Sequence, residues 1–402
     1  MDIEDLHLAC LASVPAGGGP CQLDDDDGGT WKPPKSAGAS ARWRLFSKVT
    51  EMDRIKAQAR TPSILSCSRR TDVPWAFLRQ YLKAFREGFL YVRSPVTGEM
   101  DPVCVIPFDA ATGKGVLCIS WWSKNYSKWI EEYQKEDSIL HSYPLHMFNF
   151  TVNSDDKVLE PGLSSCLKER LGQVTWLAQQ FGAHALNVRF DPIVHYRKLA
   201  GADSSVHDNL QDFEEIVRHI GQLGIDHITF SFCKPYKQSV RNMRVNGVEL
   251  VALSDAQQRK VLDRLLPMAH RYGVEMRCCC DSPLFGHRCA AEAKVEVRKV
   301  RRWGAVGKDK ENIIMSKDAE FLTVKESRCL DARLADRLAK EKGLSITFPH
   351  QKDRGQREQC NCTASREIGQ YELQCPHSCL YCYANPKPVE TALETDVTVA
   401  PV

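Results

Sequence analysis

The chain has 402 residues, 43% of them hydrophobic, which is enough to bury a large core. Its formal net charge of only +3 does not indicate a polyelectrolyte binder of nucleic acid, although a local basic groove is compatible with it. No apolar run is long enough to span a membrane, so we expect no membrane partner.

Residues 1–60 have the composition of a disordered N-terminal extension. They contain the glycine-rich run Gly17–Pro20 and the aspartates Asp24–Asp27, which are typical of linkers. The acidic start argues against a signal or transit peptide. With 17 cysteines and no export signal, we expect a reducing, cytoplasmic compartment, where clustered cysteines are more often metal ligands than disulfides. Residues 389–402 are expected to form a second disordered tail.

One unit recurs between these tails: a helical pattern, a glycine, and a short apolar strand with a polar end. For example, Leu167, Leu171 and Val174 share a helical face, Gly182 follows, and residues 185–190 form the strand. Strands that alternate with amphipathic helices indicate a parallel sheet with right-handed crossovers. Eight strands are predicted, at residues 63–67, 115–120, 146–152, 185–190, 226–232, 274–279, 344–348 and 368–373.

That number of strands favours a (β/α)8-type, TIM-like barrel over an open sheet, which is the alternative. We expect the barrel to span residues 61–355 and a cysteine-rich segment at residues 356–388 to complete it. In such barrels the chemistry lies at the carboxyl ends of the strands.

Polar side chains follow six of the predicted strands. The candidates for catalysis or substrate binding are Arg69, Asp72, Lys124, Asn125, Arg189 and Asp191. The cationic members could bind a carboxylate or a phosphate, and the aspartates could orient them or accept a proton. Alternatively, these residues only mark where strands meet solvent, and Trp121 and Trp122 belong to the core. Six such ends in one sheet favour a polar active site.

The most informative motif is C-x3-C-x2-C, formed near the C-terminus by Cys375, Cys379 and Cys382. Three thiolates can hold three irons of one [4Fe–4S] cluster and leave the fourth iron open. A zinc site, which needs a fourth ligand, and a metal-free structural knot are the alternatives. Just upstream, Cys360 and Cys362 would either serve a second metal site or complete a zinc site.

Further cysteines lie outside this segment. Cys329 opens a predicted helix and is a candidate metal ligand. Cys67, Cys233, Cys279 and Cys280 lie at or just past strand ends. Each of these four could ligate a second metal or be a bystander, because a buried free cysteine is usually inert.

Together these residues resemble a family known only as a domain of unknown function, family 1848. The matching blocks are Ser66–Asp72, Trp122–Asn125, Arg189–Ile193, Cys329–Asp331, Lys352–Asp353 and Cys360–Asn385. The match covers roughly residues 62–386 and implies no established activity. The chain differs from the family pattern at Ser123, where threonine is usual, and at Glu367, where aspartate is usual.

The C-x3-C-x2-C motif, with an aromatic residue before its last cysteine, also resembles the cluster loop of radical S-adenosylmethionine enzymes. Those enzymes are full or partial (β/α) barrels. The resemblance implies a [4Fe–4S] cluster, S-adenosylmethionine with Tyr381 and Asn385 on the cofactor side, and an electron donor. Their motif lies near the start of the barrel and this one near its end, which a circular permutation would reconcile. The Trp122–Asn125 strand end is similar to the spore photoproduct lyase branch, which would imply a nucleic-acid substrate.

These observations lead to two main hypotheses. The first is an iron–sulfur enzyme of the radical S-adenosylmethionine type that acts on an unknown substrate in the barrel mouth. The second is a zinc-stabilised, non-catalytic module that binds nucleic acid or protein. A third interpretation is an enzyme whose cluster acts only as a Lewis acid or redox relay.

Overall fold

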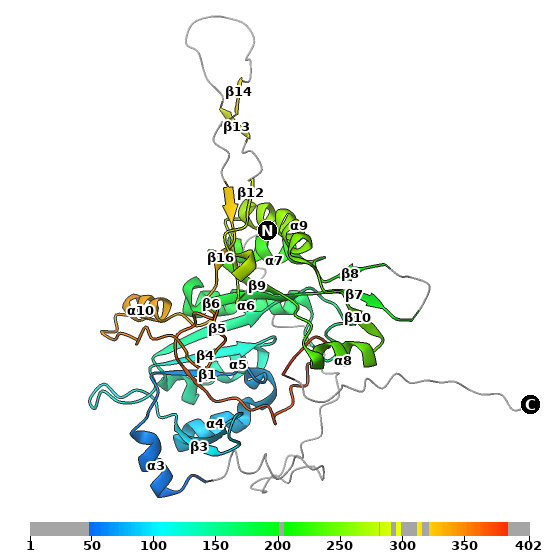
Figure 1. Cartoon of the computed structure of the whole chain (residues 1–402). Coiled ribbons are helices and arrows are strands. Elements are labelled where there is room, and N and C mark those ends of the chain that lie inside the picture. The colour runs from blue at the N-terminus through cyan, green and yellow to red at the C-terminus, as the bar shows by residue number, and fades with distance from the viewer. Residues whose placement is uncertain are drawn as a thin grey trace, which may run out of the picture.

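The computed structural model describes residues 48–200, 205–280, 282–290, 295–298, 312–315 and 321–384 (Figure 1). Most of the predicted N-terminal extension, the whole predicted C-terminal tail and Asn385 lie outside these residues. In the described ranges, none of the helices combines the length and the apolar character needed to cross a membrane.

The central sheet has eight strands, and every neighbouring pair runs parallel, which confirms the α/β class. From one edge to the other the strands are β16 (Lys325–Glu326), β11 (Glu275–Cys278), β9 (His227–Phe232), β6 (Leu186–Ile193), β5 (Leu145–Thr151), β4 (Cys118–Ser123), β1 (Ile64–Cys67) and β17 (Arg366–Glu367). Thus the last strand in the chain, β17, pairs with the first, β1.

This strand order is the order expected of a (β/α)8 barrel, but the sheet has two edges. No pair joins β16 to β17 among the described strands, so the predicted closed barrel is not confirmed. The segments beside the two edges do meet. The amide of Thr363 donates to the carbonyl of Leu330 at 2.8 Å, and the hydroxyl of Thr363 accepts from the amide of Ala332 at 2.9 Å.

Helices follow most strands and bury apolar faces against the sheet. They are α3 (Glu51–Gln58), α4 (Leu78–Glu87), α5 (Ser127–Tyr133), α6 (Leu167–Phe181), α7 (Phe213–Gln222), α8 (Lys237–Val245), α9 (Asp255–Arg271) and α10 (Ala332–Glu341). Shorter helical turns are η1 (Val73–Phe77), η2 (Ile139–Ser142), η3 (Ala183–Ala185) and η4 (Ser282–Leu284). Leu171 and Val174 of α6 and Ile216 of α7 share one buried core with Val188 of β6 and Ile228 of β9. The predicted helical faces are therefore core faces.

The structure differs from the prediction at the last two strands. Residues 344–348 form no strand, because this segment folds back on α10: the amide of Leu344 donates to the carbonyl of Ala339 at 2.8 Å, and the amide of Phe348 donates to Asp336 Oδ1 at 2.7 Å. The seventh strand is β16, which precedes α10 instead of following it. The eighth, β17, has only two residues and ends just before the predicted range 368–373.

Smaller antiparallel sheets are attached to this frame. The pairs are β2 (Phe89–Arg93) with β3 (Met100–Cys104), β7 (His195–Lys198) with β8 (His207–Asp208) and β10 (Val248–Leu250), β12 (Arg288–Ala290) with β15 (Phe321–Thr323), and β13 (Val295–Arg298) with β14 (Asn312–Met315). β13 and β14 lie beyond β12, away from the central sheet (Figure 1). The sheets after β6 and β11 are inserted at the carboxyl ends of those strands, the end at which the site is predicted.

A buried row of polar side chains crosses the central sheet. Asn149 Nδ2 donates to Ser120 Oγ at 3.1 Å, and Asn187 Nδ2 donates to Asn149 Oδ1 at 2.8 Å. Thr229 Oγ1 lies 2.7 Å from both Asn187 Oδ1 and Ser327 Oγ. Because alternate residues of a strand face opposite sides, this row leaves the apolar residues to face the helices. One face of the sheet is thus polar inside the fold.

Candidate metal and substrate site at the strand ends

The loop after β17 carries the C-x3-C-x2-C motif and returns to the carboxyl ends of β1 and β4. His377 Nε2 lies 2.8 Å from Asp72 Oδ2, and the carbonyl of His377 accepts from the amide of Gly162 at 3.0 Å. A Cβ atom at Gly162 would lie 2.2 Å from the carbonyl oxygen of Pro376, so this close approach requires glycine. The loop is therefore held at the predicted site by backbone and side-chain contacts.

The three motif cysteines are gathered in this loop. Cys379 is buried, whereas Cys375 and Cys382 are half-buried, and the three sulfur atoms lie close enough to interact electrostatically. The amide of Cys382 donates to the carbonyl of Cys379 at 3.0 Å, and Ser378 has a φ of 55°, so the backbone turns tightly between the thiols. Burial raises the pKa of Cys375 to about 12 and raises that of Cys379 well above its usual value. Such thiols stay protonated unless a cation compensates the thiolate charge.

Asp72 is the residue that ties this loop to the ends of the strands. Its carboxylate accepts hydrogen bonds from Ser123 Oγ at 2.8 Å, from the amide of Lys124 at 3.0 Å and from the amide of Trp75 at 3.0 Å. With His377 as a further partner, both oxygens of Asp72 are occupied. These contacts include no side chain of Arg69, Arg70 or Lys124 among the described residues, so the predicted role of Asp72, orienting the cations or accepting a proton, stays a prediction. His377 Nδ1 is buried and has no hydrogen-bond partner among the described residues.

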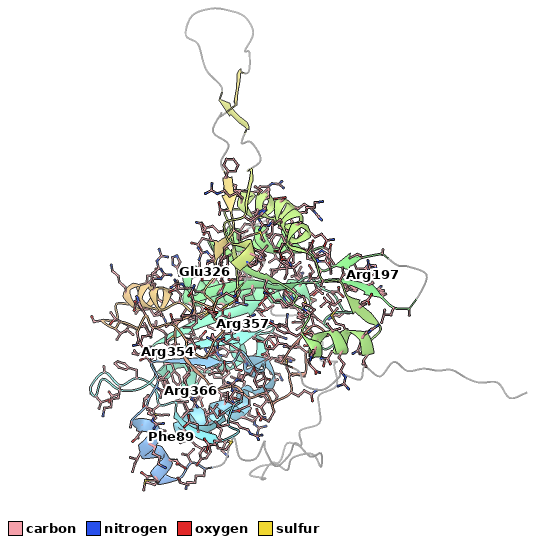
Figure 2. The ribbon with its side chains drawn as sticks, in the orientation of Figure 1. Phe89, Arg197, Glu326, Arg354, Arg357 and Arg366 are labelled. Carbon is pink, nitrogen blue, oxygen red and sulfur yellow. The ribbon has the colours of Figure 1, made fainter. Side chains whose placement is uncertain are left out.

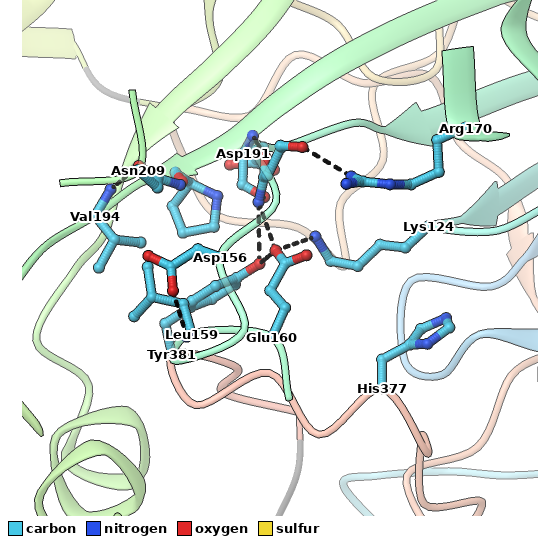
Figure 3. Close-up of polar contacts among 12 residues, drawn as sticks. Lys124, Asp156, Leu159, Glu160, Arg170, Asp191, Val194, Asn209, His377 and Tyr381 are labelled. Carbon is cyan, nitrogen blue, oxygen red and sulfur yellow. Dashed lines mark hydrogen bonds and ion pairs between the residues drawn. The ribbon is translucent and has the colours of Figure 1, made fainter. Parts of the chain in front are cut away.

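A second buried carboxylate, Glu160, collects donors from three segments (Figure 3). Glu160 Oε1 accepts from Lys124 Nζ at 2.9 Å and from Asn153 Nδ2 at 2.8 Å, and it also accepts from the Tyr381 hydroxyl. Burial alone would raise the pKa of Glu160, but Lys124 and the hydrogen bond from Tyr381 hold it below its usual value. The ammonium of Lys124 and the carboxylate are thus both charged. Within the described structure, the other oxygen, Glu160 Oε2, is buried without a partner.

Two arginines flank Trp122 at the mouth of the site. The guanidinium carbons of Arg69 and Arg189 each lie 5.4 Å from the Trp122 ring. Arg69 also contacts Asp353 at 3.3 Å, whereas Arg189 pairs with Asp191. Trp122 is half-buried, and its Nε1 is enclosed without a hydrogen-bond partner in the described part of the chain. This arrangement therefore offers a ligand two guanidinium groups, the face of the Trp122 ring and the N–H of Trp122 as a hydrogen-bond donor.

Asn125 and Asp191 have well-defined places in the structure. Asn125 Oδ1 accepts from the amide of Ser127 and from Gln173 Nε2, both at 3.0 Å, so it braces the loop after β4. Asp191 accepts from Arg189 and Ser231, and its side chain is 22% exposed, which leaves it open to a ligand. Catalytic roles for both residues stay predictions.

The predicted ligands Cys329, Cys360 and Cys362 gather elsewhere, with Cys279 and Cys280. Cys279 Sγ lies 3.3 Å from Cys329 Sγ and 3.8 Å from Cys280 Sγ. Side-chain contacts also join Cys280 to Cys360, Cys360 to Cys362, and Cys362 to Cys329, and none of the five forms a disulfide. The predicted metal residues therefore form two groups: the motif triad and this thiol ring.

Arg189 contacts the thiol ring as well as Trp122. Arg189 Nη1 donates to Cys329 Sγ at 2.8 Å. Hydrogen bonds from Cys279 and Cys362, together with the charge of Arg189, hold the pKa of Cys329 well below its usual value despite burial. Cys329, which contacts the arginine, therefore carries thiolate charge more readily than an ordinary buried thiol.

As the side chains stand in the described ranges, no three or more histidine, cysteine, aspartate or glutamate residues are arranged so that they could hold a metal ion. The donor set of the motif loop nonetheless fits an iron–sulfur cluster chemically. Three thiols lie in one tight, mostly buried turn, and each would have to rotate toward a common centre. Buried thiolates there need a cationic partner, which such a cluster provides.

A cavity of about 500 Å³ runs along the polar face of the central sheet. It is lined by Asn149, Asn187 and Ser327 of the buried polar row, and it reaches Cys329 of the thiol ring. A second cavity of about 460 Å³ lies beside Arg69 and Arg70. The first cavity touches Cys329 but is otherwise lined largely at the amino ends of β6, β9 and β11, and within the described residues no triad cysteine lines either cavity. Each is large enough for a small molecule.

Asn153 is the polar residue that follows the predicted strand 146–152, but sequence reasoning gave it no role, and it missed Glu160 and His377. Glu160 lies in an irregular segment after β5 with no motif, and no sequence signal marks it. His377 stands between two motif cysteines, and that position was the only signal available.

The comparison with known families agrees with this organisation. A family model described as a domain of unknown function, DUF1848, matches residues 64–384, from β1 through the three-cysteine loop. No curated protein matches the chain. The matched range includes the triad, the thiol ring and all the strands of the central sheet, so the chain belongs to the DUF1848 family.

Proposed function

We propose that this protein is an iron–sulfur enzyme of the radical S-adenosylmethionine type, with Cys375, Cys379 and Cys382 as ligands of a [4Fe–4S] cluster. The position of the three-cysteine loop carries the proposal. Contacts to Asp72 and Gly162 hold the loop at the carboxyl ends of parallel strands, the end at which α/β enzymes place their chemistry. We infer that the sheet is a TIM-like barrel that stays open between β16 and β17.

When bound, such a cluster supplies one electron, received from a separate donor, for the cleavage of S-adenosylmethionine held at its open iron. The chain's own residues position and shield the reactants. The Lys124–Glu160 pair and Tyr381 form a rigid buried wall beside the triad, because each member is hydrogen-bonded to another. Glu160 Oε2, buried without a partner among the described residues, would accept a hydrogen bond from a bound amino group.

Arg69, Arg189 and Trp122 form the substrate side in this proposal. Two guanidinium groups beside one indole suit a substrate that combines an anionic group with a flat ring. A nucleotide, free or within a nucleic acid, has both features. Asp191, next to Arg189 and partly exposed, would orient that guanidinium or accept a proton.

The decisive experiment is anaerobic reconstitution with iron and sulfide, followed by reduction and addition of S-adenosylmethionine. We expect about four irons and four sulfides per chain, a low-temperature electron paramagnetic resonance signal that changes on adding S-adenosylmethionine, and formation of 5′-deoxyadenosine. Cys379→Ala should abolish all three results. Cys118→Ala, which removes a buried thiol from β4, should retain them. Iron without 5′-deoxyadenosine would leave only a Lewis-acid or redox role.

The competing function is a zinc-stabilised module without catalysis, which binds nucleic acid or protein. It predicts zinc in the motif loop and no bound iron after anaerobic purification. Metal analysis of the unaltered chain and of Cys379→Ala separates the two, because only the enzyme proposal requires that iron be lost in the variant.

A further inference from the structure

The thiol ring, Cys279, Cys280, Cys329, Cys360 and Cys362, is not used by the proposed function. Its members come from three segments of the chain. Cys279 and Cys280 directly follow β11, Cys329 lies after β16, and Cys360 and Cys362 precede β17. Five reduced cysteines from such distant segments have come together in the interior of the fold.

The thiol ring lies at the gap between the two edges of the central sheet. The backbone bond from Thr363 to Leu330 joins the same segments, one residue beyond Cys362 and one beyond Cys329. Asn361, between the two cysteines of the C-x-C pair, donates to Glu326 of β16. Figure 2 labels Glu326 of β16 and Arg357, which precedes the C-x-C pair. A bond between the sulfur atoms of these segments would therefore also join the β16 edge of the sheet to the β17 edge.

Four observations favour a bound metal over a cluster of inert thiols. Each sulfur contacts two others, and none is oxidised to a disulfide. Four of the five residues, all but Cys279, are at least 94% buried. Two arginines, Arg189 and Arg357, direct positive charge at the ring. Soft thiolates in a buried site with compensating cations are the donor set that zinc and iron prefer.

The spacing of the sulfur atoms distinguishes a single ion from a cluster. Tetrahedral zinc with bonds of about 2.3 Å to sulfur holds its ligand atoms about 3.8 Å apart. Between two of the sulfur atoms from different segments, those of Cys279 and Cys329, the separation is 3.3 Å, slightly shorter than that value. A cluster with several irons between the ligands would hold them farther apart. As the described side chains stand they do not enclose an ion, so the thiols of the ring would rotate to surround one.

We propose that Cys279, Cys329, Cys360 and Cys362 bind one zinc ion, at a site separate from the motif triad. Cys279 is chosen over Cys280 because its sulfur makes the 3.3 Å contact with Cys329 of another segment. Each thiol loses its proton to solvent on binding, and no oxidation is involved. The ion joins the segments after β11 and β16 to the segment before β17.

The test begins with the full-length triad variant Cys375→Ala/Cys379→Ala/Cys382→Ala, which cannot hold the proposed iron–sulfur cluster. Purified without oxygen, this variant should contain about one zinc per chain and no iron. Adding Cys329→Ser and Cys362→Ser should reduce zinc to below about a tenth of that amount, since two of four ligands are lost. Adding Cys118→Ala, a buried thiol outside the ring, or Cys280→Ser should leave the zinc in place.

A second measurement does not depend on variants that could fail to fold. Zinc is removed from the triad variant with a chelator, and Co²⁺ is added in its place. Intense thiolate-to-cobalt absorption and tetrahedral d–d bands, saturating at about one Co²⁺ per chain, support the proposal. Absence of these bands, zinc that persists after loss of Cys329 and Cys362, or iron with sulfide in the triad variant would overturn it. Loss of 5′-deoxyadenosine formation alone, with zinc intact, contradicts the proposed function and leaves the zinc site standing.

Discussion

Asp72 and Glu160, two buried carboxylates, hold the cysteine loop by different physical means. Asp72 accepts hydrogen bonds from neutral donors and contacts His377, so it holds the loop by the positions of these hydrogen bonds. Glu160 forms an ion pair with Lys124 in which the side chains are only 4% and 15% exposed. A buried ion pair adds little net stability, but the loss of one partner leaves an uncompensated charge. At the residue scale, the most sensitive contact is therefore the Lys124–Glu160 pair.

We predict that Glu160→Gln lowers the free energy of unfolding by about 3–5 kcal/mol, because the Lys124 ammonium is left without its counter-ion. The paired variant Glu160→Gln/Lys124→Met should lose less than the two single variants together, since no charge remains. Urea unfolding of the four proteins measures this coupling. Additive losses would contradict the view that the ion pair is the reason for the sensitivity.

The same carboxylate predicts an acid dependence. The pKa of Glu160 is lowered in the folded protein, so its stabilising contribution is complete above the unfolded value of about 4.3 and is lost as the pH falls through the lower folded value. Between pH 7 and about pH 5, the wild type and Glu160→Gln should therefore differ by a constant amount, and the difference should shrink below pH 4.

Both proteins in this pH series should carry the three triad alanines, so that metal loss does not contribute. Glu136→Gln, at an exposed position, is the matched control and should show no such trend. If the difference in unfolding free energy between wild type and Glu160→Gln grew at low pH, the pKa of Glu160 would be raised in the folded protein, and the prediction would be wrong.

At the scale of elements, the three-cysteine loop depends on the segment after β5. Residue 162 has room only for glycine, because the backbone of Pro376 and His377 passes directly against it. The loop has no regular secondary structure of its own from Cys375 to Cys382. Its shape is therefore determined by the surface on which it lies.

We predict that Gly162→Ala displaces the loop and sharply reduces iron incorporation, with a loss of stability of about 1–3 kcal/mol. Gly172→Ala is the control: this glycine lies within α6 with nothing within 4 Å of an added Cβ, so alanine should raise stability by about 0.5–1 kcal/mol. Iron content after reconstitution and thermal unfolding measure both effects. Normal iron binding by Gly162→Ala would show that the loop forms its site without this contact.

Comparing the predicted and observed strands shows which parts of the fold the sequence could predict. Six strands carry apolar runs long enough to be recognised, and the structure has them in the predicted order. β16 and β17 have two residues each and show no periodicity, whereas residues 344–348 have a strand-like pattern but pack on α10. Spacing alone identified the triad as a candidate metal site. The partnership of Cys279 with Cys329 depends on strand neighbours that only the fold brings together.

At the scale of the whole molecule, the two cysteine groups lie at different places on the sheet. The triad is held beside β1 and β4, the two strands next to the edge strand β17, whereas the thiol ring lies by β11 and the segments that flank both edges. Arg189 connects the two regions, because it contacts Trp122 of β4 and Cys329 of the ring. Removing the zinc should therefore loosen the sheet edges before it affects the central strands.

Hydrogen exchange tests this order of events directly. In the triad variant, chelation of zinc should speed exchange of the Thr363 amide, which joins the two edges, and of the Ser327 and Cys279 amides next to the ring. The expected acceleration is about tenfold or more, equivalent to about 1.4 kcal/mol of local opening. The amides of Phe148 and Phe150 in β5 should change little, because parallel strands hold β5 on both sides. Uniform acceleration would mean that the ion supports the global fold, and no change would mean that the edges are held by the Thr363–Leu330 contact alone. Adding Co²⁺ should restore protection at the edges, since the same four thiolates bind either ion.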